Sequence, residues 1–229
     1  MDYDLKIVGG TIVDGSGNEG YRGDVGIKGG RVMALGGAMG DSGGEIGGEA
    51  VRTIDAGGLV VCPGFVDIHT HYDAQVLWDR MLTISPWHGV TTAVMGNCGF
   101  GVAPMRSRDR KDIMKTLEKV EGMSYAALEA GLGLDWPFES FPEYLGAVQN
   151  NGTAINLTAF IGHTPLRIYV MGDDAMEREA TEREVQAMAD IVREAMAAGA
   201  IGFSTSRAVT HNAFDGRPLP SRLAAFSEI

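Results

Sequence analysis

The chain has 229 residues, and its 45% hydrophobic content is ordinary for a globular protein with a packed core. Its formal net charge is −11 and it has no cluster of lysine and arginine, which argues against nucleic acid or an anionic membrane surface as a partner. No stretch approaches the roughly 18 apolar residues that cross a membrane, and the N-terminus "MDYDLKIV" is acidic where a secretory signal would be basic. We therefore expect a cytoplasmic protein that acts on small molecules.

The first sixty residues predict a small β-domain. Short apolar stretches such as "DLKIVGG", "VRTIDAGG" and "LVVCPG" alternate with turns, and Gly29 with Gly30 can supply the positive φ of a tight hairpin. Residues 36–50, "GGAMGDSGGEIGGEA", offer little to bury and predict a mobile surface loop. We expect this domain to be sandwich-like, to span residues 1–62, and to hold Cys62 in its core.

From residue 59 onward, apolar strands alternate with helical patterns, which is typical of βαβ units and a parallel sheet. The expected strands span residues 59–68, 90–95, 155–161 and 200–204. These segments predict an α/β fold for the rest of the chain.

Helices are expected between these strands. The clearest begins at a capping box of Thr181 and Glu184 and ends at Gly199, and another is expected over residues 112–120. The aromatic segment 122–144 is expected to be an insertion folded over the mouth of the sheet. The final residues, "SRLAAFSEI", read as the start of a further helix.

Two histidines stand one residue apart in "GFVDIHTHYDAQ", at the end of the first expected parallel strand. Residues two apart on a strand face the same side, so His69 and His71 should point together. Neutral imidazoles on a rigid strand end suit a zinc-like ion. The alternative is that nearby carboxylates satisfy both rings.

Four stretches, "PGFVDIHTH", "GVTTAVMGNCG", "IGHTPLR" and "GAIGFSTS", resemble strand-end motifs of the N-acyl-D-amino-acid deacylase (D-aminoacylase) branch of the amidohydrolase superfamily. The resemblance extends over essentially the whole chain. It implies a small β-domain followed by a metal-bearing (β/α)8 barrel of the TIM type. Residues 63–229 would then form the first half of that catalytic barrel.

The resemblance implies hydrolysis of the linear amide of N-acyl-D-amino acids, in which one or two zinc ions activate a water molecule. His69, His71 and Cys98 would be the metal ligands. Many amidohydrolases bridge two metals with a carboxylated lysine at the end of strand four, but "GAIGFSTSRAV" contains no lysine, which favours a bridging Cys98 thiolate. The alternative is that Cys98 is a buried, inert thiol.

In the family, further ligands end strands five and six, and a metal-linked aspartate ends strand eight. Only four strands of the barrel are expected here, so the catalytic acid or base stays unassigned. We expect the 229-residue chain to lack deacylase activity and to associate with itself through the open edge of its barrel.

Three more residues are candidates for lining the substrate. His163 matches a family motif at a strand end, with a purely structural role as the alternative. Arg167 could bind a substrate carboxylate through its planar fork, or pair with Asp173 or Asp174. Tyr72 directly follows the histidine pair.

Two other histidines are weaker candidates for the functional site. His88 precedes the second barrel strand, at the wrong end for chemistry, and His211 stands alone in a loop. His88 is therefore interpreted as structural. His211 could border the substrate, but a structural role is the preferred interpretation for a lone histidine in a loop.

Two rival functions remain open. The chain could belong to another amidohydrolase, such as a cyclic-amide hydrolase or a deaminase, or it could be a metal-binding remnant without catalysis.

Overall fold

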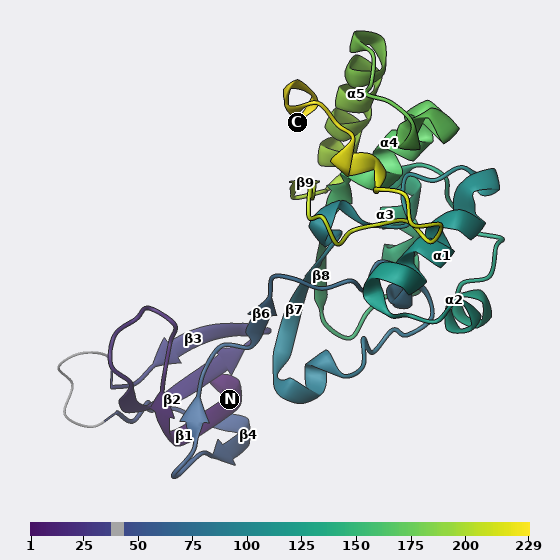
Figure 1. Cartoon of the computed structure of the whole chain (residues 1–229). Coiled ribbons are helices and arrows are strands. Elements are labelled where there is room, and N and C mark those ends of the chain that lie inside the picture. Colours follow the sequence, from purple (N-terminus) through teal and green to yellow (C-terminus); the bar gives the residue numbers. More distant parts are fainter. Residues whose placement is uncertain (38–43) are drawn as a thin grey trace. The chain divides into compact units, whose positions relative to one another are not determined.

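The computed structural model describes residues 1–37 and 44–229, which form two compact units, Met1–Gly64 and Phe65–Ile229 (Figure 1). The first unit contains a mixed β-sheet, and the second contains a parallel sheet with helices. The mobile loop predicted for residues 36–50 lies partly on residues 38–43, which are outside the described part.

The first unit is built on a five-stranded sheet in which β3, β2, β1 and β4 lie in this order and β5 also pairs with β1. The strands are β1 (Tyr3–Ile12), β2 (Tyr21–Lys28), β3 (Arg31–Leu35), β4 (Ala50–Asp55) and β5 (Val60–Val61). The β2–β3 hairpin turns at Gly29 (φ 57°) and Gly30 (φ 72°), which confirms the predicted turn. Within residues 1–37 and 44–64 there is one sheet rather than the two layers of a sandwich.

Cys62 is exposed, so its predicted place in the core was wrong. It follows β5, which has two residues and pairs only with the end of β1. A strand this short leaves the next side chain beyond the ladder. The core of the unit is formed instead by residues such as Ile12, Val25 and Ala56.

The second unit contains a four-stranded parallel sheet in the order β6, β7, β8, β9. These strands are β6 (Phe65–Asp67), β7 (Val90–Met95), β8 (Asn156–Gly162) and β9 (Gly202–Ser204). Parallel neighbours need crossover connections, and helices supply most of them here. They are α1 (Arg110–Glu121), α2 (Tyr125–Gly131) and α3 (Phe141–Asn151) before β8, and α4 (His163–Met171) and α5 (Glu182–Ala198) before β9.

The strand predicted at 90–95 coincides with β7, but the one predicted at 59–68 was wrong. Pro63 and Gly64 interrupt it, because proline cannot donate to a strand ladder and glycine weakens one. The chain therefore forms β5 in the first unit and β6 in the second.

The predicted start and end of helix α5 are confirmed. The Thr181 hydroxyl accepts a hydrogen bond from the Glu184 backbone, the Glu184 carboxylate accepts one from the Thr181 backbone, and Gly199 ends the helix at φ 116°. Helix α1 is longer than predicted at both ends and stops at Glu121, where Gly122 adopts φ 70°.

Segment 122–144 contributes four of its five aromatic side chains to the core, at 1–4% exposure; they are Trp136, Phe138, Phe141 and Tyr144, while Tyr125 is partly buried. The helix predicted at the end of the chain was wrong. The final residues form two short 3-10 helices, Pro220–Arg222 and Phe226–Glu228, rather than an α-helix. Across residues 1–37 and 44–229, no helix combines the length and the apolar character needed to cross a membrane.

Candidate metal centre

The histidine pair follows directly on β6. Between the two histidines, Thr70 is buried and binds the Val94 carbonyl twice, through its backbone N–H (3.0 Å) and its hydroxyl (2.8 Å). This bonding continues the extended pairing with β7 beyond the end of the strand. Because side chains alternate along extended chain, His69 and His71 share the face opposite Thr70.

Cys98 lies in a tight turn after β7. Gly96 (φ 78°), Cys98 (φ 57°) and Gly99 (φ 73°) all adopt left-handed conformations. Such a conformation is uncommon and strained for a residue with a side chain. A Cβ at Gly96 would lie 2.1 Å from the Phe160 carbonyl oxygen, so the turn requires glycine there.

Hydrogen bonds fix this turn to its neighbours. The Asn97 side-chain amide donates to the Val94 carbonyl (2.8 Å) and approaches the Thr70 carbonyl (3.4 Å). The Ser204 hydroxyl, at the end of β9, donates to the Gly96 carbonyl and accepts from the Gly99 N–H (3.0 Å). The turn is thereby tied both to the histidine segment and to the last strand of the sheet.

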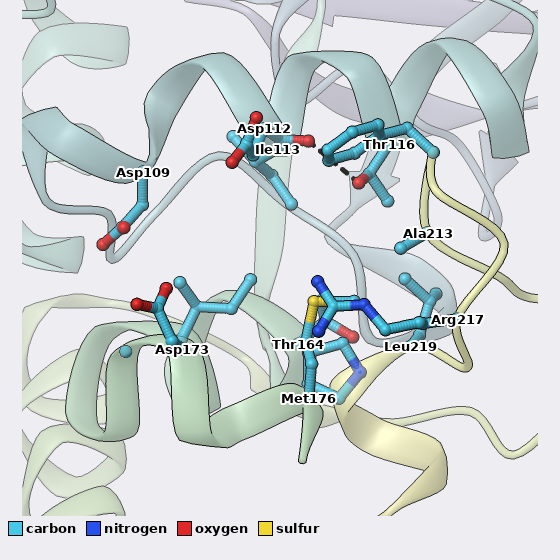
Figure 2. Close-up of a pocket in the computed structure, with 14 residues that line it drawn as sticks. Asp109, Asp112, Ile113, Thr116, Thr164, Asp173, Met176, Ala213, Arg217 and Leu219 are labelled. Carbon is cyan, nitrogen blue, oxygen red and sulfur yellow. Dashed lines mark hydrogen bonds between the residues drawn. The ribbon is translucent and has the colours of Figure 1, made fainter.

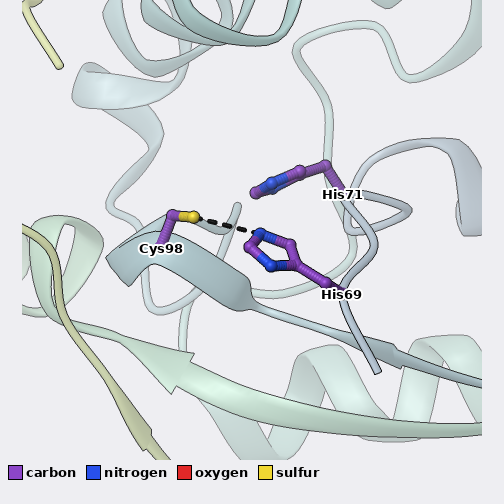
Figure 3. Close-up of side chains that lie close together, drawn as sticks. All are labelled: His69, His71 and Cys98. Carbon is purple, nitrogen blue, oxygen red and sulfur yellow. Dashed lines mark hydrogen bonds between the residues drawn. The ribbon is translucent and has the colours of Figure 1, made fainter. Parts of the chain in front are cut away.

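The result is a cluster of three donor side chains, His69, His71 and Cys98 (Figure 3). One ligand atom from each lies within 4.8 Å of the others. The His69 Nε2 and Cys98 Sγ atoms are 3.1 Å apart, and the two imidazole centroids are 5.4 Å apart. Two imidazoles and a thiol are the donor types that zinc prefers, so these residues fit such an ion.

Burial sets the protonation of the cluster. It is the largest of three effects, the others being the neighbouring His69 and His211, that together lower the pKa of His71 to about 4, so the ring is neutral at pH 7 as a metal ligand must be. Burial, with the charge of Glu121, raises the pKa of the Cys98 thiol. A divalent cation would lower that pKa, so binding would release a proton from the thiol.

A sequence profile of the amidohydrolase family matches residues 52–227. The chain belongs to this family. It is 40% identical over 204 residues to D-aminoacylase of Alcaligenes xylosoxydans xylosoxydans, a match that covers 89% of this chain and 37% of the relative.

Two solved structures of amidohydrolases are also similar. A crystal structure of D-aminoacylase has 35% sequence identity and a TM-score of 0.76, with 99% of this chain and 41% of that one covered. N-acyl-D-glutamate deacylase from Bordetella bronchiseptica, in complex with zinc and a phosphonate mimic of the tetrahedral intermediate, has 33% identity and a TM-score of 0.74, with 100% and 41% covered. D-aminoacylase has a binuclear metal centre. The chain spans about two-fifths of the length of these relatives.

In this amidohydrolase chain, Glu121 is a neighbour of the cluster that the sequence did not reveal. Its Oε1 atom is 3.5 Å from His71 Nδ1, and its side chain is 18% exposed. Burial raises the pKa of this carboxyl, while His69 acts in the opposite direction. One signal was available: an acidic residue in the last turn of a helix is disfavoured by the helix dipole and calls for a specific partner.

His163 and Arg167 belong to a buried network. His163 Nδ1 is 2.8 Å from the Thr205 hydroxyl, and its Nε2 is 2.8 Å from Glu228 Oε1. Arg167 is fully buried and donates to Glu228 (2.6 Å) and to the Arg178 carbonyl (2.8 Å). The partner predicted for Arg167, Asp173 or Asp174, was therefore wrong. A substrate contact by either side chain would require this network to open.

The remaining candidates lie in different surroundings. The Tyr72 hydroxyl is 2.5 Å from the Ser85 hydroxyl. His211 Nδ1 is 3.0 Å from the Ser206 hydroxyl. The centroid of the His211 ring is 5.3 Å from that of Phe100, and the Phe100 centroid is 6.3 Å from that of His71. The structure thus brings His211 toward the cluster, while His88 is exposed before β7.

A cavity of about 210 Å³ is separate from the cluster (Figure 2). It is bounded by Asp112 of α1, by the 3-10 helix Gly172–Met176 and by the loop that carries Arg217, and none of the three donor residues lines it. Arg217 already pairs with Glu177 (2.5 Å) and Asp215 (2.7 Å), so its charge is not free for a substrate carboxylate. Within residues 1–37 and 44–229, the donor side chains that could hold a metal ion lie at the strand ends instead.

Proposed function

We propose that the chain forms the β-domain and the first half of the catalytic barrel of a zinc-dependent amidohydrolase, one that cleaves the linear amide of N-acyl-D-amino acids. The domains would span residues 1–62 and 63–229. The observation that carries the proposal is the meeting of His69, His71 and Cys98 from two consecutive strand ends. The similarity to D-aminoacylase supports the substrate class.

Zinc bound at such a site acidifies water and polarises an amide carbonyl. The two imidazoles would supply nitrogen ligands, and Cys98 would supply a thiolate whose charge offsets the repulsion between two neighbouring cations. The distribution of lysines favours this role for Cys98. Of the five lysines, two lie on β1 and β2 of the first unit and three lie on α1, so none stands at a strand end of the parallel sheet; they are Lys6, Lys28, Lys111, Lys115 and Lys119.

The function is tested on the longest natural product of this reading frame, because the present chain covers about two-fifths of its relatives. The zinc-loaded protein is assayed against N-acetyl-D-amino acids, their L-enantiomers and hydantoin, with a His69→Ala variant as the control. We expect faster turnover of the D-enantiomers and its loss in the variant. Faster turnover of hydantoin than of any linear amide would replace this proposal with a cyclic-amide hydrolase.

A further inference from the structure

We propose that Glu121 is a positioning residue for His71, a role that rests on the proposed metal site. After a small side-chain rotation its carboxylate would accept a hydrogen bond from the His71 Nδ1–H and so hold the ring with Nε2 toward the metal. Glu121 comes from the end of α1, whereas the three donors come from the ends of β6 and β7.

The first support is an unsatisfied atom. Nδ1 of His71 is buried and has no hydrogen-bond partner within residues 1–37 and 44–229. Phe100, which flanks the ring, offers no acceptor, and Nε2 of His69 is turned toward Cys98. Glu121 Oε1, 3.5 Å away, is the carboxylate oxygen in reach. The contact is a few tenths of an ångström longer than a good hydrogen bond, so a small rotation of either side chain closes it.

The second support is the position of Glu121. A carboxylate at the C-terminus of a helix faces the negative end of the dipole, and this one is also largely removed from water. Gly122, at φ 70°, ends the helix directly afterwards and fixes where the side chain emerges. An acidic residue at this position does not stabilise the helix. Its presence is explained if the carboxylate accepts a hydrogen bond from a histidine N–H whose ring binds a cation.

The geometry also assigns the nitrogens of His71. With Nδ1 turned to Glu121, Nε2 is the atom left to face His69 and Cys98. Ligating histidines commonly donate their other N–H to a carboxylate, which fixes the tautomer and makes the ring a stronger ligand. Glu121 would do this for one of the two histidines, while its charge also raises the pKa of the Cys98 thiol.

The test is zinc affinity of the 229-residue protein, measured by competition with a chromophoric chelator, for Glu121→Ala, Glu121→Gln, His71→Ala and the double variant Glu121→Ala/His71→Ala. Glu194→Ala is the matched control, since Glu194 is an exposed acid near the end of α5. Far-UV circular dichroism verifies that each variant is folded. The isosteric Gln variant keeps an acceptor oxygen and serves if the Ala variant does not fold.

We expect Glu121→Ala to weaken zinc binding by about 10- to 100-fold, Glu121→Gln to weaken it less, and Glu194→Ala to bind as the wild type does. Glu121→Ala should cause no further loss in the His71→Ala background, because the carboxylate supports the metal through that ring and its removal only lowers the pKa of the Cys98 thiol. Unchanged affinity in both Glu121 variants would overturn the proposal, and so would a full additional loss in the double variant. If the wild type itself binds no zinc, the metal site is refuted and this role with it.

Discussion

Gly96→Ala should destabilise the second unit more than a glycine-to-alanine change usually does. Gly96 has φ 78°, and a Cβ there would lie 2.1 Å from the Phe160 carbonyl oxygen. The left-handed backbone costs an alanine about 1 kcal/mol. Relieving the overlap requires movement between β7 and β8, which pair next to this point at Met95 and Ala159. Overpacking of this kind costs about 1–3 kcal/mol, so we expect a total loss of about 2–4 kcal/mol.

The matched control is Gly216→Ala, because Gly216 also has a positive φ (88°) but a Cβ there would meet no other atom within 4 Å. It should lose only the backbone cost. Urea unfolding followed by circular dichroism gives both free energies of unfolding. The same shift should displace Cys98 and weaken zinc binding, since ligands must be held within about 0.5 Å. Equal stability of the two variants, within about 0.5 kcal/mol, would refute the account of this turn.

Three further predictions concern a buried ion pair, a half-buried histidine and the open sheet edge. Glu228→Leu should lower the free energy of unfolding by about 3–5 kcal/mol in urea titrations, because it leaves the Arg167 charge buried and unpaired, and adding Arg167→Met should recover much of the loss. Unfolded His71 takes up a proton near pH 6.5 and the folded ring only near pH 4, so the metal-free protein should lose stability as the pH falls between these values, and less so in His71→Asn. The zinc-loaded 229-residue protein should show no deacylase activity and should self-associate on size-exclusion chromatography, because β6 exposes Phe65 (59%) and Val66 (56%); an active monomer would contradict this.

Elements whose ends are defined by nearby glycines or capping residues could be predicted from the sequence. The β7 strand lies between Gly89 and Gly96, and α5 lies between a capping box and Gly199, so sequence punctuation defines both. The strand predicted at 59–68 failed because its apolar run continues through Pro63 and Gly64, where backbone constraints outweigh side-chain hydrophobicity.

In the site, too, contacts set by local spacing could be predicted from the sequence, and contacts set by long-range packing could not. His69 and His71 were predictable as a pair because their spacing alone fixes their common face. The partner of Arg167 was not, since Glu228 is 61 residues away and is chemically equivalent, in sequence, to the nearer Asp173 and Asp174. The position of Glu121 beside the cluster and the left-handed turn at Cys98 likewise depend on how α1 and β7 pack. The spacing of apolar residues in the sequence does not reveal this packing.

The central claim is that His69, His71 and Cys98 together hold zinc, and elemental analysis of the purified 229-residue protein tests it directly. The wild type should carry at least one zinc ion per chain, and Cys98→Ala and His69→Ala should each lose it. Cys62→Ala is the control, because that thiol is free and exposed, and it should retain the metal. Zinc content in Cys98→Ala equal to that of the wild type would contradict the claim and leave Cys98 as an inert thiol.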